Sequence, residues 1–253
     1  MRIQRLNWAG IAIEHGDTTI FIDAMTDVSG WDDMDEAALR AQVVVPQATT
    51  IYRYAAITHL HGDHFDTDAL QGVLNAQSYL VCEHASAQRA NWRGLRVRSV
   101  GLYEPLILAN STADLVAFAV PSADRFGDPQ VAWVVDGGGR RILHAGDTIW
   151  LGHWWNIGRA YGPFDVVFLP INGVTYSLGR NTGSAIPATL TPEQAATAAK
   201  LLGAKSVCPI HYGMFHNQTT YREHPDVERS FVAHAEAQGV PVRLMRAGEW
   251  LVL

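Results

Sequence analysis

Alternating apolar and polar positions predict β-structure in two hairpins. Ile11 and Ile13 alternate with smaller residues, Gly16-Asp17 offers a turn, and the β-branched and aromatic run 18–23 follows it. A second hairpin is expected where the runs 131–136 and 141–145 flank three consecutive glycines. Strands separated by a short glycine-containing turn are typical of β-hairpins.

Further apolar runs predict single strands, at 54–57, 78–82, 96–100, 105–108, 114–120, 166–171, 206–210 and 242–245. The run 166–171 is almost continuously apolar, as expected for a strand buried on both faces.

Helices are expected over 34–41, 67–75, 84–92, 191–203 and 225–238. The fourth has a clear start signal, with Thr191 as N-cap, Pro192 at the first helical position and Gln194 completing a capping box. The second can be capped by Asp66 or Thr67. The stretch 24–53 otherwise shows no periodicity. Because long irregular loops are usually functional or disordered, we interpret it as a flap beside a functional site.

The order of these elements suits two packed β-sheets with helices outside. No linker, repeat or low-complexity segment interrupts the pattern, so we expect one domain over 1–253.

The densest chemistry lies directly after the predicted strand 54–57. Four potential ligands fall within six positions: His59, His61, Asp63 and His64. Alternate residues at a strand exit can point the same way, so His59 and His61 can hold one metal ion, and Asp63 and His64 a second one nearby. Imidazole and carboxylate groups are the usual ligands of zinc and related divalent ions. A lone histidine is usually structural, but this cluster predicts a metal site.

The H-x-H-x-D-H pattern resembles the signature of the metallo-β-lactamase superfamily. The resemblance implies an α+β fold, a four-layered αββα sandwich of two mixed sheets. It also implies that Asp147, in Gly146-Asp147-Thr148, bridges two metals, and that His211 completes the second site. Asp23, at the end of the first hairpin, falls where the family usually has an aspartate. Asp63 and Asp147 are the expected catalytic carboxylates.

One position departs from the family pattern. Where related members carry a histidine after a strand and a proline, this chain has Pro121-Ser122-Ala123-Asp124. We predict that Asp124 takes the histidine's place as a ligand, with Asp128 as the competing candidate. A carboxylate there favours harder ions such as manganese or iron, although zinc stays the first expectation for the two divalent ions.

Other histidines and aromatic residues are assigned more loosely. We expect His144 to pack or support the ligands and His84 to be structural. Residues that could form walls of a substrate pocket are Trp31, Trp150, His153, Tyr176 and His216, together with Trp154 and Trp155.

The expected chemistry is hydrolysis. Two divalent ions can lower the pKa of a shared water to near neutrality and polarise the attacked carbonyl or phosphoryl oxygen, so no serine or cysteine nucleophile is required.

Composition and charge limit the classes of molecule that we expect the protein to bind. The net charge of −6 and a pI of about 6.0 disfavour a nucleic-acid partner, and no apolar segment is long enough for a signal peptide or a membrane span. Cys82 and Cys208 each lie in an apolar run and are expected to be reduced thiols. We therefore expect a cytoplasmic protein with a small-molecule substrate and no membrane partner, and a homo-oligomer is left open.

Within the superfamily the chain looks most like the ascorbate-6-phosphate lactonase branch, through Leu169-Pro170-Ile171 and Pro209-Ile210-His211-Tyr212. It is also similar to the N-acylphosphatidylethanolamine phospholipase branch. The expected substrate is a lactone, ester or phosphoester, most simply a small phosphorylated or carbohydrate-like molecule. The insertion between Tyr176 and Thr191 departs from the family pattern and leaves the substrate open.

Three alternative functions remain. A transfer-RNA-processing nuclease shares the ligands but would carry a basic arm. A di-iron oxygen-reducing protein usually has glutamate at the position of His61. A non-catalytic metal-binding protein is favoured only by Asp124.

Overall fold

Two mixed β-sheets form the centre of the protein. The computed structural model describes residues 1–29, 34–89, 92, 94–108, 114–176, 185–215 and 220–253. The first sheet has seven strands, in the order β15 (Trp250–Val252), β1 (Arg2–Arg5), β2 (Ile11–His15), β3 (Thr18–Ile22), β4 (Tyr52–Ala56), β5 (Tyr79–Glu83) and β6 (Val97–Val100). Strands β15 to β3 are antiparallel, whereas β3 to β6 run parallel.

The second sheet has six strands, in the order β13 (Val207–Ile210), β11 (Val166–Pro170), β10 (Arg140–His144), β9 (Val131–Gly137), β8 (Val116–Pro121) and β7 (Pro105–Ile107). Here β13, β11 and β10 are parallel and the remaining pairs antiparallel. A small separate sheet pairs β12 (Thr175–Tyr176) with β14 (Tyr221–Arg222).

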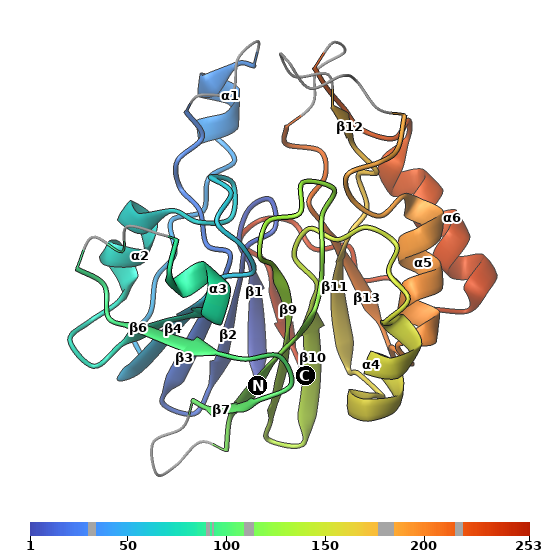
Figure 1. Ribbon diagram of the computed structural model, residues 1–253. Coiled ribbons are helices and arrows are strands. Elements are labelled where there is room, and N and C mark those ends of the chain that lie inside the picture. The colour runs from blue at the N-terminus through green and yellow to red at the C-terminus, as the bar shows by residue number, and fades with distance from the viewer. Residues whose placement is uncertain (30–33, 90–91, 93, 109–113, 177–184, 216–219) are drawn as a thin grey trace.

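Helices cover the outer faces of both sheets (Figure 1). On the side of the first sheet lie α2 (Thr67–Val73) and α3 (His84–Ala87), and on the side of the second lie α4 (Trp154–Tyr161), α5 (Pro192–Leu201) and α6 (Val227–Gln238). The short helix α1 (Glu36–Arg40) stands at the top of the view. The predicted αββα architecture is confirmed.

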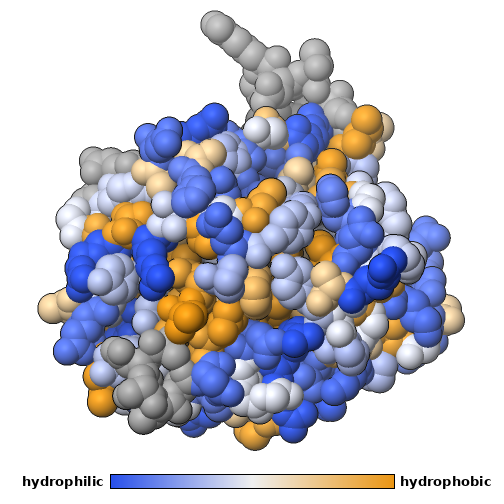
Figure 2. All heavy atoms as spheres, turned by 60° about the horizontal axis from the view of Figure 1, so that its bottom comes forward, coloured by the Kyte–Doolittle hydropathy of each residue, from blue (hydrophilic) through white to orange (hydrophobic). Residues whose placement is uncertain are grey.

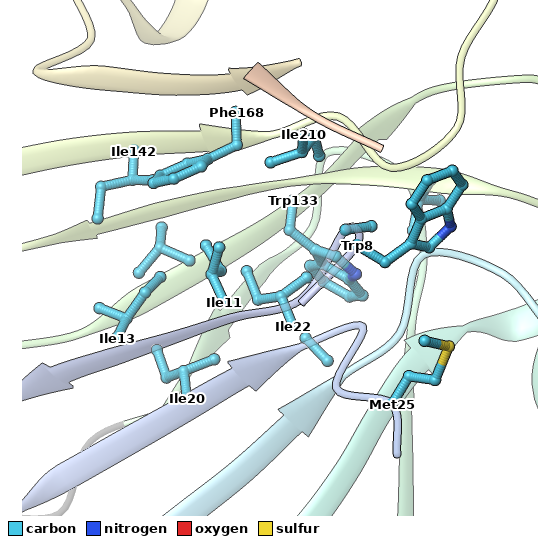
Figure 3. Close-up of a cluster of buried hydrophobic side chains, with 14 of the residues drawn as sticks. Trp8, Ile11, Ile13, Ile20, Ile22, Met25, Trp133, Ile142, Phe168 and Ile210 are labelled. Atoms are coloured by element: carbon cyan, nitrogen blue, oxygen red, sulfur yellow. The ribbon is translucent and has the colours of Figure 1, made fainter. Parts of the chain in front are cut away.

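Apolar side chains fill the space between the layers. Between the sheets, isoleucines of β2 and β3 face residues of the second sheet such as Trp133 and Phe168 (Figure 3). A second cluster joins the second sheet to α4, α5 and α6, and a third lies behind the first sheet. Burying this much apolar surface from both sheets is what holds the layers together.

The strand directions bring several loops to one edge. Strands β1, β3 and β4 all run the same way in the first sheet, as do β8, β10, β11 and β13 in the second. The loops that follow them leave toward the top of Figure 1, whereas both termini lie toward the bottom. Figure 2 turns that bottom face forward and shows apolar side chains gathered near its centre among hydrophilic ones.

Most predicted elements are present. The capping box at Thr191 forms, Asp66 caps α2, and Gly239 ends α6 in a left-handed conformation. Cys82 and Cys208 are buried and free, as predicted. No helix in the described part of the chain is long and apolar enough to cross a membrane.

Two predicted elements differ from the structure, and five elements were not predicted: β1, β12, α4, β14 and β15. The strand expected at 242–245 is only an isolated bridge at Val242. The last strand is β15, a three-residue apolar segment whose first and last side chains are exposed. The helix expected over 84–92 ends at Ala87. Helix α4 was not predicted, because it has no side-chain N-cap and contains Gly158. That glycine is required by packing, since a Cβ there would lie 2.4 Å from the Leu201 carbonyl oxygen.

Candidate metal centre

The histidine cluster occupies the turn between β4 and α2. His59 and His64 are fully buried, Asp63 is nearly so, and His61 is partly exposed. Asp66, at the end of this turn, caps α2 through Oδ1. Its Oδ2 accepts hydrogen bonds from the backbone N–H groups of Thr26 and Asp27. One carboxylate thus ties the loop after β3 to the ligand turn.

A first group of ligand atoms comes from the loops that follow β4 and β8. His59 Nε2 lies 2.9 Å from His61 Nδ1, and His61 Nδ1 lies 3.5 Å from Asp124 Oδ2. These three residues offer ligand atoms that lie within 4.8 Å of one another. The structure therefore brings together the three residues that the sequence assigned to the first metal.

Asp124 is held in place by its own turn. Its Oδ1 accepts the backbone N–H groups of Phe126 and Gly127 at 2.8 and 3.1 Å, and its Oδ2 is buried without a hydrogen-bond partner. Asp128 lies on the other side of His61: its Oδ2 is 3.1 Å from His61 Nε2, and its side chain is 45% exposed. Asp124 therefore joins His59 and His61 in the first group, whereas Asp128 contacts the opposite edge of the His61 ring.

A second group joins four buried residues: Asp63, His64, Asp147 and His211. His64 Nε2 lies 3.2 Å from Asp147 Oδ1 and 3.5 Å from Asp63 Oδ2, and His211 Nε2 lies 2.7 and 3.4 Å from the same two atoms. Four ligands at zinc distances of 2.0–2.2 Å in a tetrahedron would be about 3.3–3.6 Å apart. Three of the four separations are within or close to this range.

Unpartnered polar atoms support the same reading. Among the described residues, His64 Nε2, Asp147 Oδ1 and His211 Nε2 are buried without a hydrogen-bond partner, although they lie close together. Buried polar atoms are normally satisfied. Atoms that converge without bonding to one another fit a bound cation at their centre. The residues of the second group therefore fit a divalent ion, and the first group offers the same kinds of ligand atom within 4.8 Å of one another. Asp147 belongs to the second group, and its bridging role stays a prediction.

Asp23 orients two of the histidines. It accepts the Thr58 N–H at 2.9 Å and the Thr58 hydroxyl at 2.7 Å, and it lies 2.8 Å from His64 Nδ1. The Thr58 hydroxyl in turn lies 3.0 Å from His59 Nδ1. With Nδ1 of each ring engaged, Nε2 of each ring faces its ligand group, His59 Nε2 toward His61 and His64 Nε2 toward Asp63 and Asp147.

Left-handed backbone recurs around these groups, at Trp8, Asp23, Gly146 and His211. Gly146 is required on two counts: its φ is +61°, and a Cβ there would lie 2.7 Å from the Thr58 side chain. The glycine lets the turn that carries Asp147 approach the turn that carries His59. Sparsely populated backbone conformations of this kind cluster at functional sites.

Burial and charge set the protonation of the ligands. Burial raises the pKa of Asp147, but His211 and His64 outweigh it and hold that pKa well below its usual range. Burial lowers the pKa of His64, yet Asp147 and Asp63 carry it well above its ordinary value. Burial, with neighbouring His64, lowers the pKa of His59 to about 3, so this imidazole is neutral. A cation in the second group would displace protons from His64 and His211, because coordinating imidazoles must be unprotonated.

A cavity of about 460 Å³ opens beside the two groups. Its described lining consists of Asp27, Ser29, His61, Gly62, Asp63, Phe126, Asp128 and Tyr176. Asp27 and Ser29 belong to the loop that we interpreted as a flap. Tyr176, predicted to contact substrate, lines the cavity and packs edge-on against Phe126, with ring centroids 5.3 Å apart.

The other predicted pocket residues do not all lie there. Trp150 and His153 are exposed near the start of α4 and are not among the described lining residues. Trp154, by contrast, is buried in the core behind the second sheet. Trp31 and His216 lie outside the described residues.

His144 and His84, expected to support the site or to be structural, lie outside the two ligand groups. His144 is buried, with its Nε2 2.7 Å from the Ala9 carbonyl oxygen, and belongs to neither ligand group. His84 lies at the surface, where it contacts Ser99 and Glu104.

Three residues of this site escaped the sequence analysis: Trp8, Thr58 and Phe126. Trp8 donates its indole N–H to Asp63, Thr58 links Asp23 to His59, and Phe126 forms part of the cavity wall. Only Thr58, adjacent to the histidine cluster, could have been suspected from position alone.

Residues 7–212 match the family model described as "Beta-lactamase superfamily domain". The chain is similar to a "UPF0173 metal-dependent hydrolase" of Geobacillus thermodenitrificans, at 27% identity over 222 residues that cover 85% of this chain and 87% of the relative. A relative of the same description from Thermus thermophilus is 25% identical, covering 100% of this chain and 99% of its own length.

Solved structures share the fold at low identity. Igni18, a metallo hydrolase from Ignicoccus hospitalis, superposes with a TM-score of 0.71 at 22% identity, over 99% of this chain and 97% of its own. An isothiocyanate hydrolase from Delia radicum gut bacteria gives 0.69 at 16% identity, over 100% and 99%. CmlA, a diiron β-hydroxylase from Streptomyces venezuelae, gives 0.70 at 17% identity, with this chain matching 54% of its length.

Proposed function

The chain belongs to the beta-lactamase superfamily, and we propose that it hydrolyses a small carbonyl substrate, a lactone or an ester, at its two ligand groups. That it is a metal-dependent hydrolase of this superfamily follows from the family match and from relatives of that description. The observation that carries the proposal is the convergence of two ligand groups beside one cavity, the second of them fully buried and with three unpartnered ligand atoms.

The cavity lining favours an uncharged or cationic substrate over a phosphorylated one. Three carboxylates and no lysine or arginine occur among its described lining residues. Two nearby arginines already have partners: Arg89 contacts the lining residue Asp128 at 3.3 Å, and Arg125, which follows Asp124, donates to the Ile186 carbonyl. Phosphate recognition normally uses such cations. The volume of about 460 Å³ suits a small molecule.

Divalent ions held by the two groups would supply an activated water and polarise the substrate's oxygen. The chain's own residues orient the ligands and shape the site. Asp23 fixes the ring of His64, and Phe126 and Tyr176 offer an apolar wall for the substrate. Burial, together with the Asp63 and Asp147 carboxylates, raises the pKa of Tyr176, so its phenol keeps its proton and can donate a hydrogen bond to a substrate oxygen.

Two alternatives follow from the same ligand set. A phosphodiesterase of the phospholipase D or nuclease type would use the same groups on a phosphoryl centre. A non-catalytic metal protein would keep the ions without turnover.

The carboxylate of Asp124 also makes the first group a harder set of ligands, which favours manganese or iron beside zinc.

A substrate panel distinguishes these functions. The chain, loaded in turn with zinc, manganese or iron(II), is assayed on neutral lactones and esters, phosphodiesters and phosphomonoesters, with Asp147→Ala as the inactive control. We expect turnover of lactones or esters that Asp147→Ala lacks. Faster turnover of phosphodiesters would favour the first alternative, and no turnover of any class despite bound metal would favour the second.

A further inference from the structure

Trp8 stands in an unusual place for a core tryptophan. It lies in the short loop between β1 and β2, is only 3% exposed, and adopts a left-handed backbone with φ of +49°. A bulky residue in this conformation is an outlier that the surrounding structure must enforce. Figure 3 shows Trp8 at one end of the cluster between the sheets.

The side chain of Trp8 contacts two members of the second ligand group. Its indole Nε1 donates to Asp63 Oδ2 at 3.0 Å, and this is the oxygen that faces His64 and His211. A carboxylate oxygen has two lone pairs, so one accepts the indole N–H while the other remains for a metal. The indole ring also lies against the His211 ring, with centroids 4.1 Å apart.

The backbone of Trp8 holds the same histidine. The Trp8 carbonyl accepts the His211 N–H at 3.1 Å, and it also accepts a hydrogen bond from the guanidinium of Arg5. Arg5 is itself buried and donates to the Gly10 carbonyl as well, so its guanidinium stabilises both halves of the loop between β1 and β2. Side chain and backbone of one residue therefore restrain Asp63 and His211 together.

We propose that Trp8 is a positioning residue that presets Asp63 and His211 for the metal of the second group. Outer partners that fix ligand orientation typically raise metal affinity by roughly 10- to 100-fold. An ordinary core tryptophan would contribute only to stability. The inference rests on the proposed metal-dependent function, because it assumes that the second group binds a metal.

Trp133 provides a matched control for this residue. It is also fully buried and also donates its indole N–H, to the Ile57 carbonyl at 2.9 Å, but it belongs to neither ligand group. Trp133→Phe therefore removes a buried ring edge and one indole hydrogen bond without touching a ligand side chain.

The test is titration of metal-free protein with Co²⁺, read by its ligand-field absorption, for the wild type, Trp8→Phe and Trp133→Phe. An Asp124→Asn background, which disables the first group, identifies the phase that belongs to the second. We expect Trp8→Phe to weaken the second phase by roughly 10- to 100-fold and to change its absorption spectrum, with the first phase shifted less than about twofold. Trp133→Phe should lower the melting temperature and leave both phases unchanged.

Unchanged Co²⁺ affinity in Trp8→Phe, or an equal loss in Trp133→Phe, would overturn the proposal. If Trp8→Phe fails to fold, 3-benzothienylalanine at position 8 replaces only the N–H with sulfur, and the same weakening is expected of it. A wild-type chain that binds no Co²⁺ in the second group would contradict the proposed function itself, which keeps the two failures apart.

Discussion

Asp124→Asn separates the two roles of this side chain, which are to accept hydrogen bonds within its turn and to place a negative charge beside His61. The amide oxygen can still accept the N–H groups of Phe126 and Gly127, as Oδ1 does at 2.8 and 3.1 Å, so the turn is preserved. The atom that replaces Oδ2 no longer carries a negative charge toward His61. Asp124→Ala, by contrast, loses both the charge and the turn.

The expected magnitudes differ accordingly. Two hydrogen bonds of about 1 kcal/mol each give a loss of about 2 kcal/mol for the metal-free alanine variant. In a chain of this length that corresponds to a melting temperature lower by about 4–8 °C, whereas the asparagine variant should change by less than about 2 °C. Both variants should lose at least about 100-fold in first-group metal affinity, the upper end of what outer partners alone contribute.

The assay is a chelator competition with Zn²⁺ and Mn²⁺, with melting curves recorded on metal-free protein. Asp128→Asn is the control, because Asp128 is 45% exposed and exposed pairs contribute about 0–1 kcal/mol. First-group affinity that survives in Asp124→Asn, or an equal loss in Asp128→Asn, would refute the assignment of Asp124 as a ligand.

Other substitutions give sharp expectations. His61→Ala and Asp147→Ala should each abolish hydrolysis with the circular dichroism spectrum unchanged, and Asp147→Ala should also lower total metal by elemental analysis; full metal and activity in Asp147→Ala would contradict its role. Asp124→His should shift preference toward zinc over manganese in a competition titration, and an unchanged ratio would count against a ligand at this position. Gly146→Ala should lower both the melting temperature and the metal content, because its Cβ would lie 2.7 Å from the Thr58 side chain. The expected loss in the free energy of unfolding, measured by calorimetry, is about 1–3 kcal/mol. An unchanged free energy of unfolding would show that this close approach is not needed.

Periodicity and cap chemistry predicted the fold well where the signal is local. The capping box at Thr191 and the cap at Asp66 are contained within four residues each, and both formed. Strand β15 is only three residues long and depends on pairing with β1 at the other end of the chain, a long-range contact that a local pattern cannot reveal. Helix α4 is stabilised by tertiary packing through Gly158, which local propensity cannot reveal.

The residues of the site, too, were predictable where the signal is local and not where it depends on long-range contacts. Ligands at strand exits were predictable because parallel strands bring their ends to one edge, and the histidine cluster marks that edge in the sequence. Trp8 was not predictable, because its role comes from a left-handed turn that faces Asp63 from 55 positions away. The pocket aromatics show the limit of composition: Tyr176 lines the cavity, whereas Trp150 is exposed near the start of α4.

Metal stoichiometry is the most decisive measurement for a hydrolase with two metal-binding groups. The chain is purified without chelator, its metal content is measured by elemental analysis, and hydrolysis is followed before and after chelation and after metal is restored. The two ligand groups predict more than one equivalent of zinc, manganese or iron per chain, with activity lost on removal and regained on return. A metal-free chain that hydrolyses its substrate at the full rate would show that the ligand groups do not supply the catalytic metal.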